Sequence, residues 1–278
     1  VRCCTQNGVR GGSATVHFPI WHQEIEDILV LKNNKGTEDN RVRKLDYSIQ
    51  ISKLFYERFI KNADITLFSP NHVPGLYEAF GLPEFDSLYL KYEKDKSIPK
   101  ETIGAQELFQ ALLKERAETG RIYIMNLDHC NTHSSFKDKV YMSNLCQEIT
   151  LPTTPVQHID DKEGEIALCI LSAVNLGLLT DMNELEELCD LSVRALDEII
   201  DYQEYPVEAA KISAQSRRSL GIGYIGLAHY LAKNQVKYED KKAWKLVDKI
   251  TEAFQFYLLK SSNNLAKEKS KCLWFEKT

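Results

Sequence analysis

Apolar and polar residues follow two rhythms along the first half of the chain. From Asp46 to Ile51 they alternate with a period of two, which is typical of a strand with one polar face. Short apolar or β-branched runs predict further strands at 13–18, 65–68 and 121–125. Apolar residues at helical spacing predict helices over 21–31 and 54–60 and a helical tendency over 73–117, with one helix ended by Gly120. The succession 46–51, 54–60 and 65–68 is a strand-helix-strand unit of the kind that builds parallel sheets.

The second half contains longer elements. Residues 165–172 are almost wholly apolar, which predicts a strand covered on both faces. Asn183 can cap a long helix that carries leucines and isoleucines up to Ile199, and Pro206 begins a second helix. A weak strand is expected at 219–226 and an amphipathic helix over 243–265. Strands that alternate with helices along the whole chain predict an α/β fold.

Charge and hydropathy narrow the class of protein. The chain has 278 residues, with 35 basic and 40 acidic side chains and a net charge of -5. This balance offers no basic surface for DNA or RNA, although it does not exclude a nucleotide substrate. No apolar run reaches the ~18 residues that cross a bilayer, and no signal sequence is evident, so we expect no membrane partner and a cytoplasmic location.

The seven cysteines are odd in number and form no CxxC pair. This pattern argues against a secreted disulfide framework and against a zinc ribbon, and favours free thiols in a reducing compartment. The chain begins with Val1, and two aromatic residues lie within its last five positions. We therefore expect a segment of a longer protein.

Residues 143–149 place an amide, a thiol and a carboxyl on alternate positions. In an extended segment Asn144, Cys146 and Glu148 would point to one side. An amide can orient a hydroxyl, a thiol can lose a proton or a hydrogen atom, and a carboxylate can accept a proton. On spacing alone, a half-buried strand with an ordinary thiol is the preferred explanation, because short alternating patterns are common.

Three other stretches each have a functional and a structural interpretation. The glycine-rich residues 6–12 contain Gln6 and Arg10, which could contact a base or a phosphate, or could simply form a turn. His129, Cys130 and His133 resemble metal ligands, but no second cluster completes a site, so we expect no metal and a hydrogen-bonded loop. The glycines at 221, 223 and 226 match a dinucleotide-binding pattern, but they lie in an expected strand, where close packing explains them better.

Taken together, these stretches resemble one family. The segments 144–148, 164–169 and 8–12, joined by 128–134 and 218–223, are similar to the large, catalytic subunit of the aerobic class I ribonucleotide reductases, closest to the bacterial and phage type. The resemblance runs along the whole chain and covers the central part of such a subunit. It implies part of a ten-stranded α/β barrel, made of two parallel five-stranded halves with a central finger loop. We expect residues 1–278 to form a single partial barrel domain.

The resemblance also implies roles for individual residues in reducing ribonucleoside diphosphates. Cys146 would become a thiyl radical that takes the 3′ hydrogen atom, Glu148 would accept the 3′-hydroxyl proton, and Asn144 would hold the ribose hydroxyls. Cys169 would supply reducing equivalents, and its partner thiol is not in this chain. We expect an enclosed pocket in which Cys146 and Glu148 face Cys169 across a gap of the size of a sugar.

The family implies several partners. Gln6, Arg10 and Gly11 would belong to a loop that couples a dNTP or ATP effector site to the substrate. No cofactor is expected on this chain, because the family uses a metal-containing, radical-bearing small subunit, with thioredoxin or glutaredoxin as reductant. The remaining parts of the large subunit and a second copy of it are further expected partners, and we expect residues 1–278 alone to be inactive.

Two alternatives remain at this point. A segment that kept the fold without catalysis would not depend on Cys146, and an NAD(P)-binding oxidoreductase would use Gly221, Gly223 and Gly226. The residues themselves do not discriminate diphosphate from triphosphate substrates.

Overall fold

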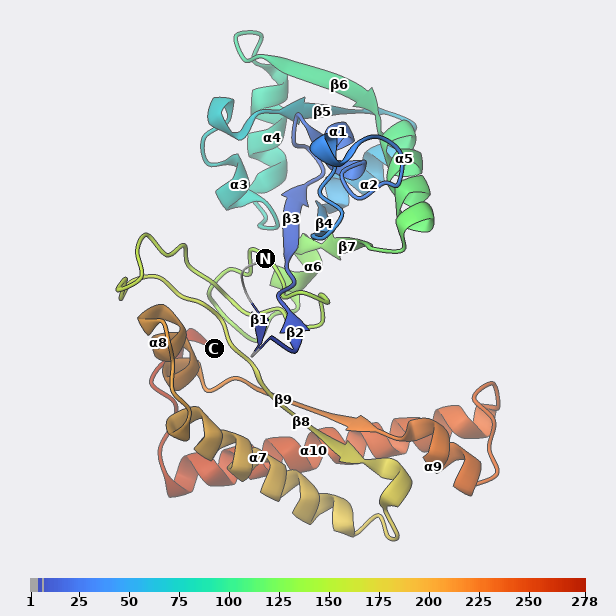
Figure 1. Ribbon diagram of the computed structural model, residues 1–278, viewed down its shortest axis with the longest axis vertical. Coiled ribbons are helices and arrows are strands. Elements are labelled where there is room, and N and C mark those ends of the chain that lie inside the picture. Colours follow the sequence, from blue (N-terminus) through green and yellow to red (C-terminus); the bar gives the residue numbers. More distant parts are fainter. Residues whose placement is uncertain (1–4, 7) are drawn as a thin grey trace. The chain divides into compact units, whose positions relative to one another are not determined.

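The computed structural model describes residues 5–6 and 8–278, and Cys3 and Cys4 therefore lie outside the described residues (Figure 1). It divides into two compact units, residues 1–152 and residues 153–278. None of the helices in the described part of the chain is long and apolar enough to cross a membrane. The expectation of a single partial barrel domain stays a prediction.

The first unit is built on a three-stranded parallel sheet. Its strands are β3 (Thr15–Pro19), β4 (Asp46–Ile51) and β7 (Ile122–Asn126), and β4 lies in the middle. Every residue of β4 is buried although the strand alternates between apolar and polar side chains. The polar face of β4 must therefore be covered by protein as completely as the apolar face.

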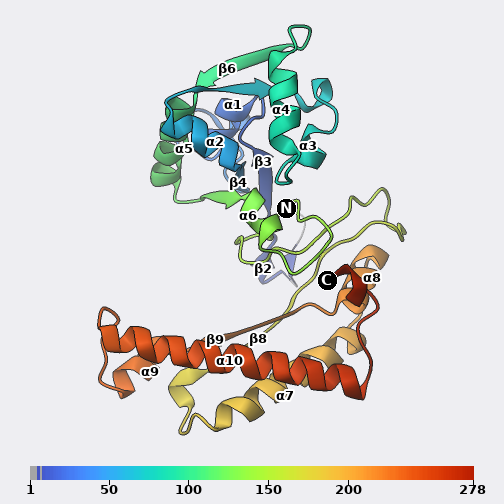
Figure 2. The ribbon, with the colours of Figure 1, turned by 180° about the vertical axis from the view of Figure 1, so that it is seen from behind.

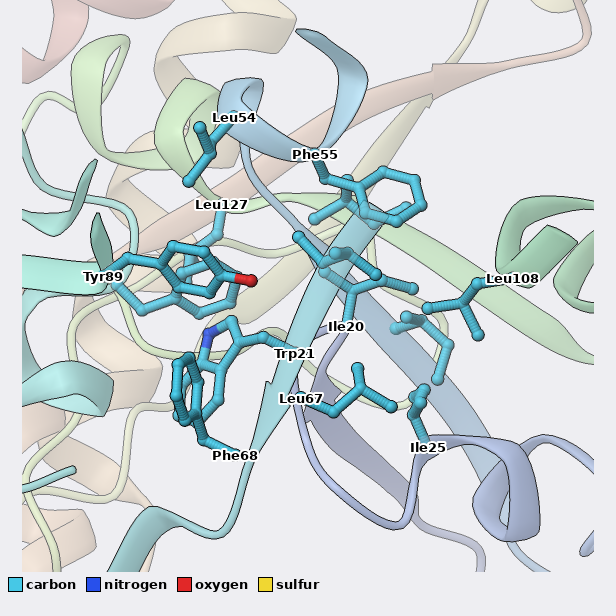
Figure 3. Packing of buried hydrophobic residues seen from close by; sticks show 14 of the residues in the cluster. Ile20, Trp21, Ile25, Leu54, Phe55, Leu67, Phe68, Tyr89, Leu108 and Leu127 are labelled. Carbon is cyan, nitrogen blue, oxygen red and sulfur yellow. The ribbon is translucent and has the colours of Figure 1, made fainter. Parts of the chain in front are cut away.

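Helices and large side chains form the core beside the sheet. Trp21, Phe55, Phe68 and Tyr89 are each at most 1% exposed and lie in one cluster with the isoleucines of β4 (Figure 3). Ring pairs such as Phe68 and Tyr89, whose centroids are 5.4 Å apart, meet edge to face. The helices of this unit are α1 (Ile25–Leu29), α2 (Lys53–Ile60), α3 (Leu76–Ala79), α4 (Phe85–Lys94), α5 (Ala105–Thr119) and α6 (Leu127–Thr132).

The expected pairing of the strand at 65–68 is wrong. This strand, β5 (Asp64–Phe68), pairs antiparallel with β6 (Lys100–Gly104) and lies outside the sheet that contains β4. The sequence hid β6 because Lys-Glu-Thr-Ile-Gly has a single apolar side chain, within a region predicted to be helical. As predicted, Gly120 ends α5, with a left-handed φ of 68° that suits glycine.

The helix expected over 21–31 is reduced to α1. The carbonyl of Trp21 accepts a hydrogen bond from the Phe68 N–H at 2.9 Å, and the Gln23 N–H donates to the Phe68 carbonyl at 2.9 Å. In a helix the Trp21 carbonyl would accept the Ile25 N–H, but here it is used by β5, and the chain stays non-helical until Ile25.

The second unit combines a parallel strand pair with helices. Strands β8 (Ile170–Asn175) and β9 (Leu220–Ile225) run parallel, and α7 and α10 lie side by side along them in both views (Figures 1 and 2). Its helices are α7 (Glu184–Tyr202), α8 (Glu208–Arg217), α9 (Leu227–Lys233) and α10 (Lys241–Glu268). Val174, Leu185, Ile250 and Phe254 form the core between these layers.

Two local expectations fail in this unit. The strand expected at 165–172 begins only at Ile170, and Leu171 is 62% exposed, so one face of the pair is open within this unit. Asn183 precedes α7, but its side chain makes no capping bond and instead donates to Asp181. The α/β class is confirmed, and within the residues that the structure describes the strands do not close into a barrel.

Short elements complete the chain. They are β1 (Thr5–Gln6), β2 (Arg10–Gly11) and the 3-10 helices η1 (Glu38–Asn40), η2 (Pro70–His72), η3 (Leu176–Leu178) and η4 (Phe275–Lys277).

Candidate functional site

The Cys146 loop, residues 141–149, forms a turn where an extended segment was expected. The Gln147 N–H donates to the Asn144 carbonyl at 3.2 Å, and Gln147 adopts a left-handed φ of 63°. The alternation that would place Asn144, Cys146 and Glu148 on one side is therefore wrong, because the chain reverses between these residues.

Side chains from the sheet hold this turn in place. The Thr15 hydroxyl of β3 donates to the Leu145 carbonyl at 2.6 Å. The Ser48 hydroxyl of β4 donates to Oε1 of Gln147, and Nε2 of Gln147 donates to the Ile124 carbonyl of β7 at 2.6 Å. All three strands of the parallel sheet therefore contact the loop next to Cys146.

The loop explains why the polar face of β4 is buried. Ser48 and Gln50 are both 0% exposed, and Nε2 of Gln50 donates to the Tyr141 carbonyl at the start of the loop. Buried polar side chains are stable when they are hydrogen-bonded, and here the loop backbone and Gln147 provide the partners. Ser48 and Gln50 are thus attachment points of the Cys146 loop, whereas the third polar residue of the strand, Asp46, pairs with Lys32 and Arg121.

A row of polar side chains crosses the sheet beneath the loop. His17, Ser48 and Tyr123 are register partners on β3, β4 and β7, so their side chains share one face. Burial lowers the pKa of the His17 imidazole, which favours its neutral form. Burial, followed by the electrostatic effect of the nearby Cys146 sulfur, raises the pKa of the Tyr123 phenol. Tyr123 is thus a close neighbour of the candidate radical thiol.

The three predicted residues of the loop differ in exposure. Cys146 and Glu148 are exposed, whereas Asn144 is half-buried. Oδ1 of Asn144 accepts the Ile149 N–H at 3.0 Å and so stabilises the turn itself. The first unit covers the base of the loop and leaves the thiol exposed, and the enclosed pocket expected to bring Cys146 and Glu148 to face Cys169 stays a prediction.

Cys169 lies in the second unit, directly before β8, and is half-buried. Four residues earlier, the carboxylate of Glu165 forms a buried ion pair with Arg217 of α8, with Nη2 and Oε2 2.9 Å apart. The Ser213 hydroxyl donates to the same carboxylate at 3.0 Å. The guanidinium also lies over the Trp274 ring at 4.9 Å. The segment that leads to Cys169 is therefore fixed to α8.

Gln6, Arg10 and Gly11 belong to a small antiparallel hairpin. Gln6 and Arg10 are direct partners in its register, as are Thr5 and Gly11, and Gly8 at the turn has a φ of 71°. Arg10 is exposed, and the side chain of Gln6 lies outside what the structure describes. The turn is present, and the coupling role of these residues stays a prediction.

The two remaining stretches are residues 129–133, which resemble metal ligands, and the glycines at 221–226. Residues 127–132 form the short helix α6 where a loop was expected, and the rings of His129 and His133 meet edge to face, 5.6 Å apart. In the described chain, no three His, Cys, Asp or Glu side chains gather to hold a metal ion. Gly221 and Gly223 lie inside strand β9, as predicted, whereas a dinucleotide fingerprint places such glycines after the strand. The expectation is wrong for Gly226, which follows the strand and caps the start of α9.

Sequence patterns alone do not reveal the residues that hold the loop. Thr15, Ser48 and Gln147 belong to no motif, although the polar alternation of Asp46, Ser48 and Gln50 predicts the strand itself. A polar face on the central strand of a parallel sheet needs a polar cover, and this requirement was the available signal.

Comparison with known proteins identifies the family. The model of the ribonucleotide reductase barrel domain matches residues 1–278. The chain is 59% identical over 283 residues to ribonucleoside-diphosphate reductase subunit alpha of Buchnera aphidicola from Schizaphis graminum. It is 57% identical to the corresponding subunit 1 alpha of Escherichia coli K12 and 45% identical to the subunit alpha of phage T4. Each match covers 100% of this chain and 37% of the relative. The chain therefore belongs to the ribonucleotide reductase barrel-domain family.

Proposed function

We propose that this chain is the central catalytic segment of a ribonucleoside-diphosphate reductase large subunit. The observation that carries the proposal is the Cys146 loop, a turn that presents an exposed thiol while strands β3, β4 and β7 all hold its base. A thiol that must exchange a hydrogen atom with a sugar needs a fixed position and open access, and this loop supplies both within its unit.

The chemistry follows from what each group can exchange. Cys146 loses an electron and a proton to a radical-generating small subunit and becomes a thiyl radical, which takes the 3′ hydrogen atom of the ribose. Glu148 accepts the 3′-hydroxyl proton, and Asn144 orients the ribose hydroxyls. The 2′ hydroxyl then leaves as water with a proton from a thiol.

The reducing equivalents come from a thiol pair. Cys169 and a second thiol together give up two electrons and two protons and end as a disulfide, while Cys146 returns its hydrogen atom to the 3′ carbon. Each cycle thus converts a ribonucleotide and two thiols into a deoxyribonucleotide, water and a disulfide. Thiol exchange with thioredoxin or glutaredoxin restores the pair.

The same proposal includes the partners and the regulation. The substrate is a ribonucleoside diphosphate, and the assembled enzyme contains the small subunit, the rest of the large subunit and a second copy of it, in the cytoplasm. The hairpin of Gln6, Arg10 and Gly11 couples a bound dNTP or ATP effector to substrate choice. Gly8 permits the tight turn of this hairpin, because its φ of 71° is unfavourable for other residues.

A chimaeric subunit tests the proposal. Residues 1–278 replace the matching segment of the Escherichia coli subunit, to which they are 57% identical, and the chimaera is assayed with the small subunit for deoxyribonucleotide formation. Cys146→Ser should lower activity at least about a thousand-fold, because a hydroxyl does not yield its hydrogen atom under these conditions. Cys130→Ser is the matched control and should retain activity. Full activity of the Cys146→Ser chimaera would instead support the non-catalytic alternative and refute the proposal.

A further inference from the structure

Two glycines on the same face of β9 have different surroundings. Gly221 pairs with Leu171 of β8, and Gly223 pairs with Ala173 two positions further along. Residues two apart in a strand face the same way, so both glycines contribute to the open face of this strand pair. The matched positions allow the effect of each missing side chain to be compared.

Of these two glycines, only Gly221 lies where a side chain would clash with its neighbours. A Cβ atom at Gly221 would lie 2.7 Å from Sγ of Cys169 and 2.5 Å from Cδ2 of Leu171. Both separations are far below the ~3.5–4 Å of a comfortable contact. A Cβ atom at Gly223 would meet no atom within 4 Å.

The two side chains that crowd Gly221 differ in how easily they could move away from an added Cβ atom. Cδ2 is the flexible end of the Leu171 side chain, which is 62% exposed and can rotate away. The sulfur of Cys169 is one bond from its Cβ, so it can move only by changing its χ1 rotamer or by moving the backbone. The backbone is restrained on both sides, by the Glu165–Arg217 ion pair before Cys169 and by the β8–β9 ladder after it.

We propose that Gly221 is a positioning residue for Cys169, because its missing side chain leaves the room that the sulfur occupies against strand β9. The inference rests on the proposed function, in which Cys169 is one of the two reducing thiols. A disulfide forms only when both sulfurs approach at about 2.05 Å with a narrow range of dihedral angles. Fixing the rotamer of Cys169 therefore favours productive attack by the partner thiol. This also gives the first glycine of the Gly-x-Gly-x-x-Gly stretch a role without a dinucleotide.

Thiol reactivity in the 278-residue chain tests the inference without requiring turnover. Gly221→Ala and Gly223→Ala chains are alkylated with iodoacetamide, and the rate at each cysteine is measured by peptide mass spectrometry. In Gly221→Ala the sulfur is displaced toward the open face, so alkylation of Cys169 should be at least about three-fold faster. In Gly223→Ala the Cys169 rate should stay at the original value, and the Cys146 rate should be unchanged in both chains.

Two controls keep the result interpretable. Cys189 is 0% exposed, and burial raises its pKa to about 11, so rapid alkylation of Cys189 would report unfolding of the second unit. The double variant Gly221→Ala, Leu171→Ala removes the leucine clash and leaves only the contact with Cys169, and it should reproduce the faster rate with Cys189 protected. Equal Cys169 rates in the Gly221→Ala and Gly223→Ala chains would overturn the inference. Loss of the proposed function would appear separately, in the Cys146→Ser chimaera.

Discussion

The two cysteines of the proposed reaction are held by different physical means. Cys146 lies on a turn whose hydrogen bonds come from side chains of three strands, and its thiol is exposed. Cys169 is half-buried and is fixed by a buried ion pair before it and by a glycine beside it. Polar attachment suits a thiol that must reach a substrate, whereas steric confinement suits a thiol that must meet another sulfur in one geometry. The comparison predicts that the two regions respond to different substitutions.

The largest effect is expected at the ion pair behind Cys169. Arg217→Met would leave the Glu165 carboxylate buried without its cation, since the two side chains are only 3% and 5% exposed. We expect the second unit to lose about 3–5 kcal/mol of stability, measured by hydrogen exchange of its peptides. The double variant Glu165→Gln, Arg217→Met should recover most of the loss.

A surface ion pair in the same unit provides the matched control. Arg194 binds Asp190 and Glu268, but its side chain is 36% exposed. Arg194→Met should cost much less stability than Arg217→Met, because solvent screens exposed charges. Equal losses of stability in the Arg194→Met and Arg217→Met variants would contradict the claim that a buried ion pair fixes the segment that leads to Cys169.

A smaller effect is expected at the base of the Cys146 loop. Gln147→Ala removes the partners of the Ser48 hydroxyl and the Ile124 carbonyl, which should cost about 2 kcal/mol locally. Gln147→Gly loses the same bonds, but glycine tolerates the φ of 63° at this position and should protect the loop better than alanine does. Hydrogen exchange of residues 143–149 checks this order, and unchanged exchange in both variants would show that the strands do not hold the loop.

The pH dependence of the first unit should reflect Lys139, near the start of the loop. Burial lowers the pKa of this amine from 10.5 to about 8, while Nζ donates to the Tyr77 and Glu78 carbonyls and lies 4.2 Å from the Tyr141 ring centroid. Between these pH values the unfolded chain binds more protons than the folded chain, so stability rises with pH.

Chemical denaturation at pH 7.5 and pH 9 measures this effect. The Lys139 amine is partly exposed, so solvent screening reduces the effect. We expect the free energy of unfolding to be about 1 kcal/mol higher at pH 9 than at pH 7.5. Lys139→Met should abolish the gain. An equal pH dependence in the variant would assign it to other groups.

The smallest effect concerns the neighbour of the candidate radical thiol. Tyr123→Phe removes the phenol that lies near Cys146 and keeps the ring. Alkylation of Cys146 should change by about two-fold, because a polar group next to the thiol is removed, while the rate at Cys169 stays the same. No change at Cys146 would mean that the phenol does not restrain the thiol.

Regular elements could be predicted from the sequence, but the contacts that build the site could not. The alternation of β4 and the apolar stripe of α10 were recognised because each depends only on neighbouring residues. The turn at Leu145 to Gln147 depends on Thr15 and Ser48, which are separated from their loop partners by 130 and 99 residues. No local pattern reports such partners. The family resemblance identified the candidate residues, and the structure shows the contacts that hold them in place.

The most direct test of the two roles is a single turnover without an external reductant. The complete chimaeric enzyme is incubated with substrate and small subunit, quenched, alkylated and mapped by peptide mass spectrometry. Because the reaction oxidises a thiol pair and returns the hydrogen atom to the 3′ carbon, Cys169 should be found in a disulfide and Cys146 as a thiol, with one product formed per disulfide. Product formation that leaves Cys169 as a thiol, or that consumes Cys146, would contradict the assignment.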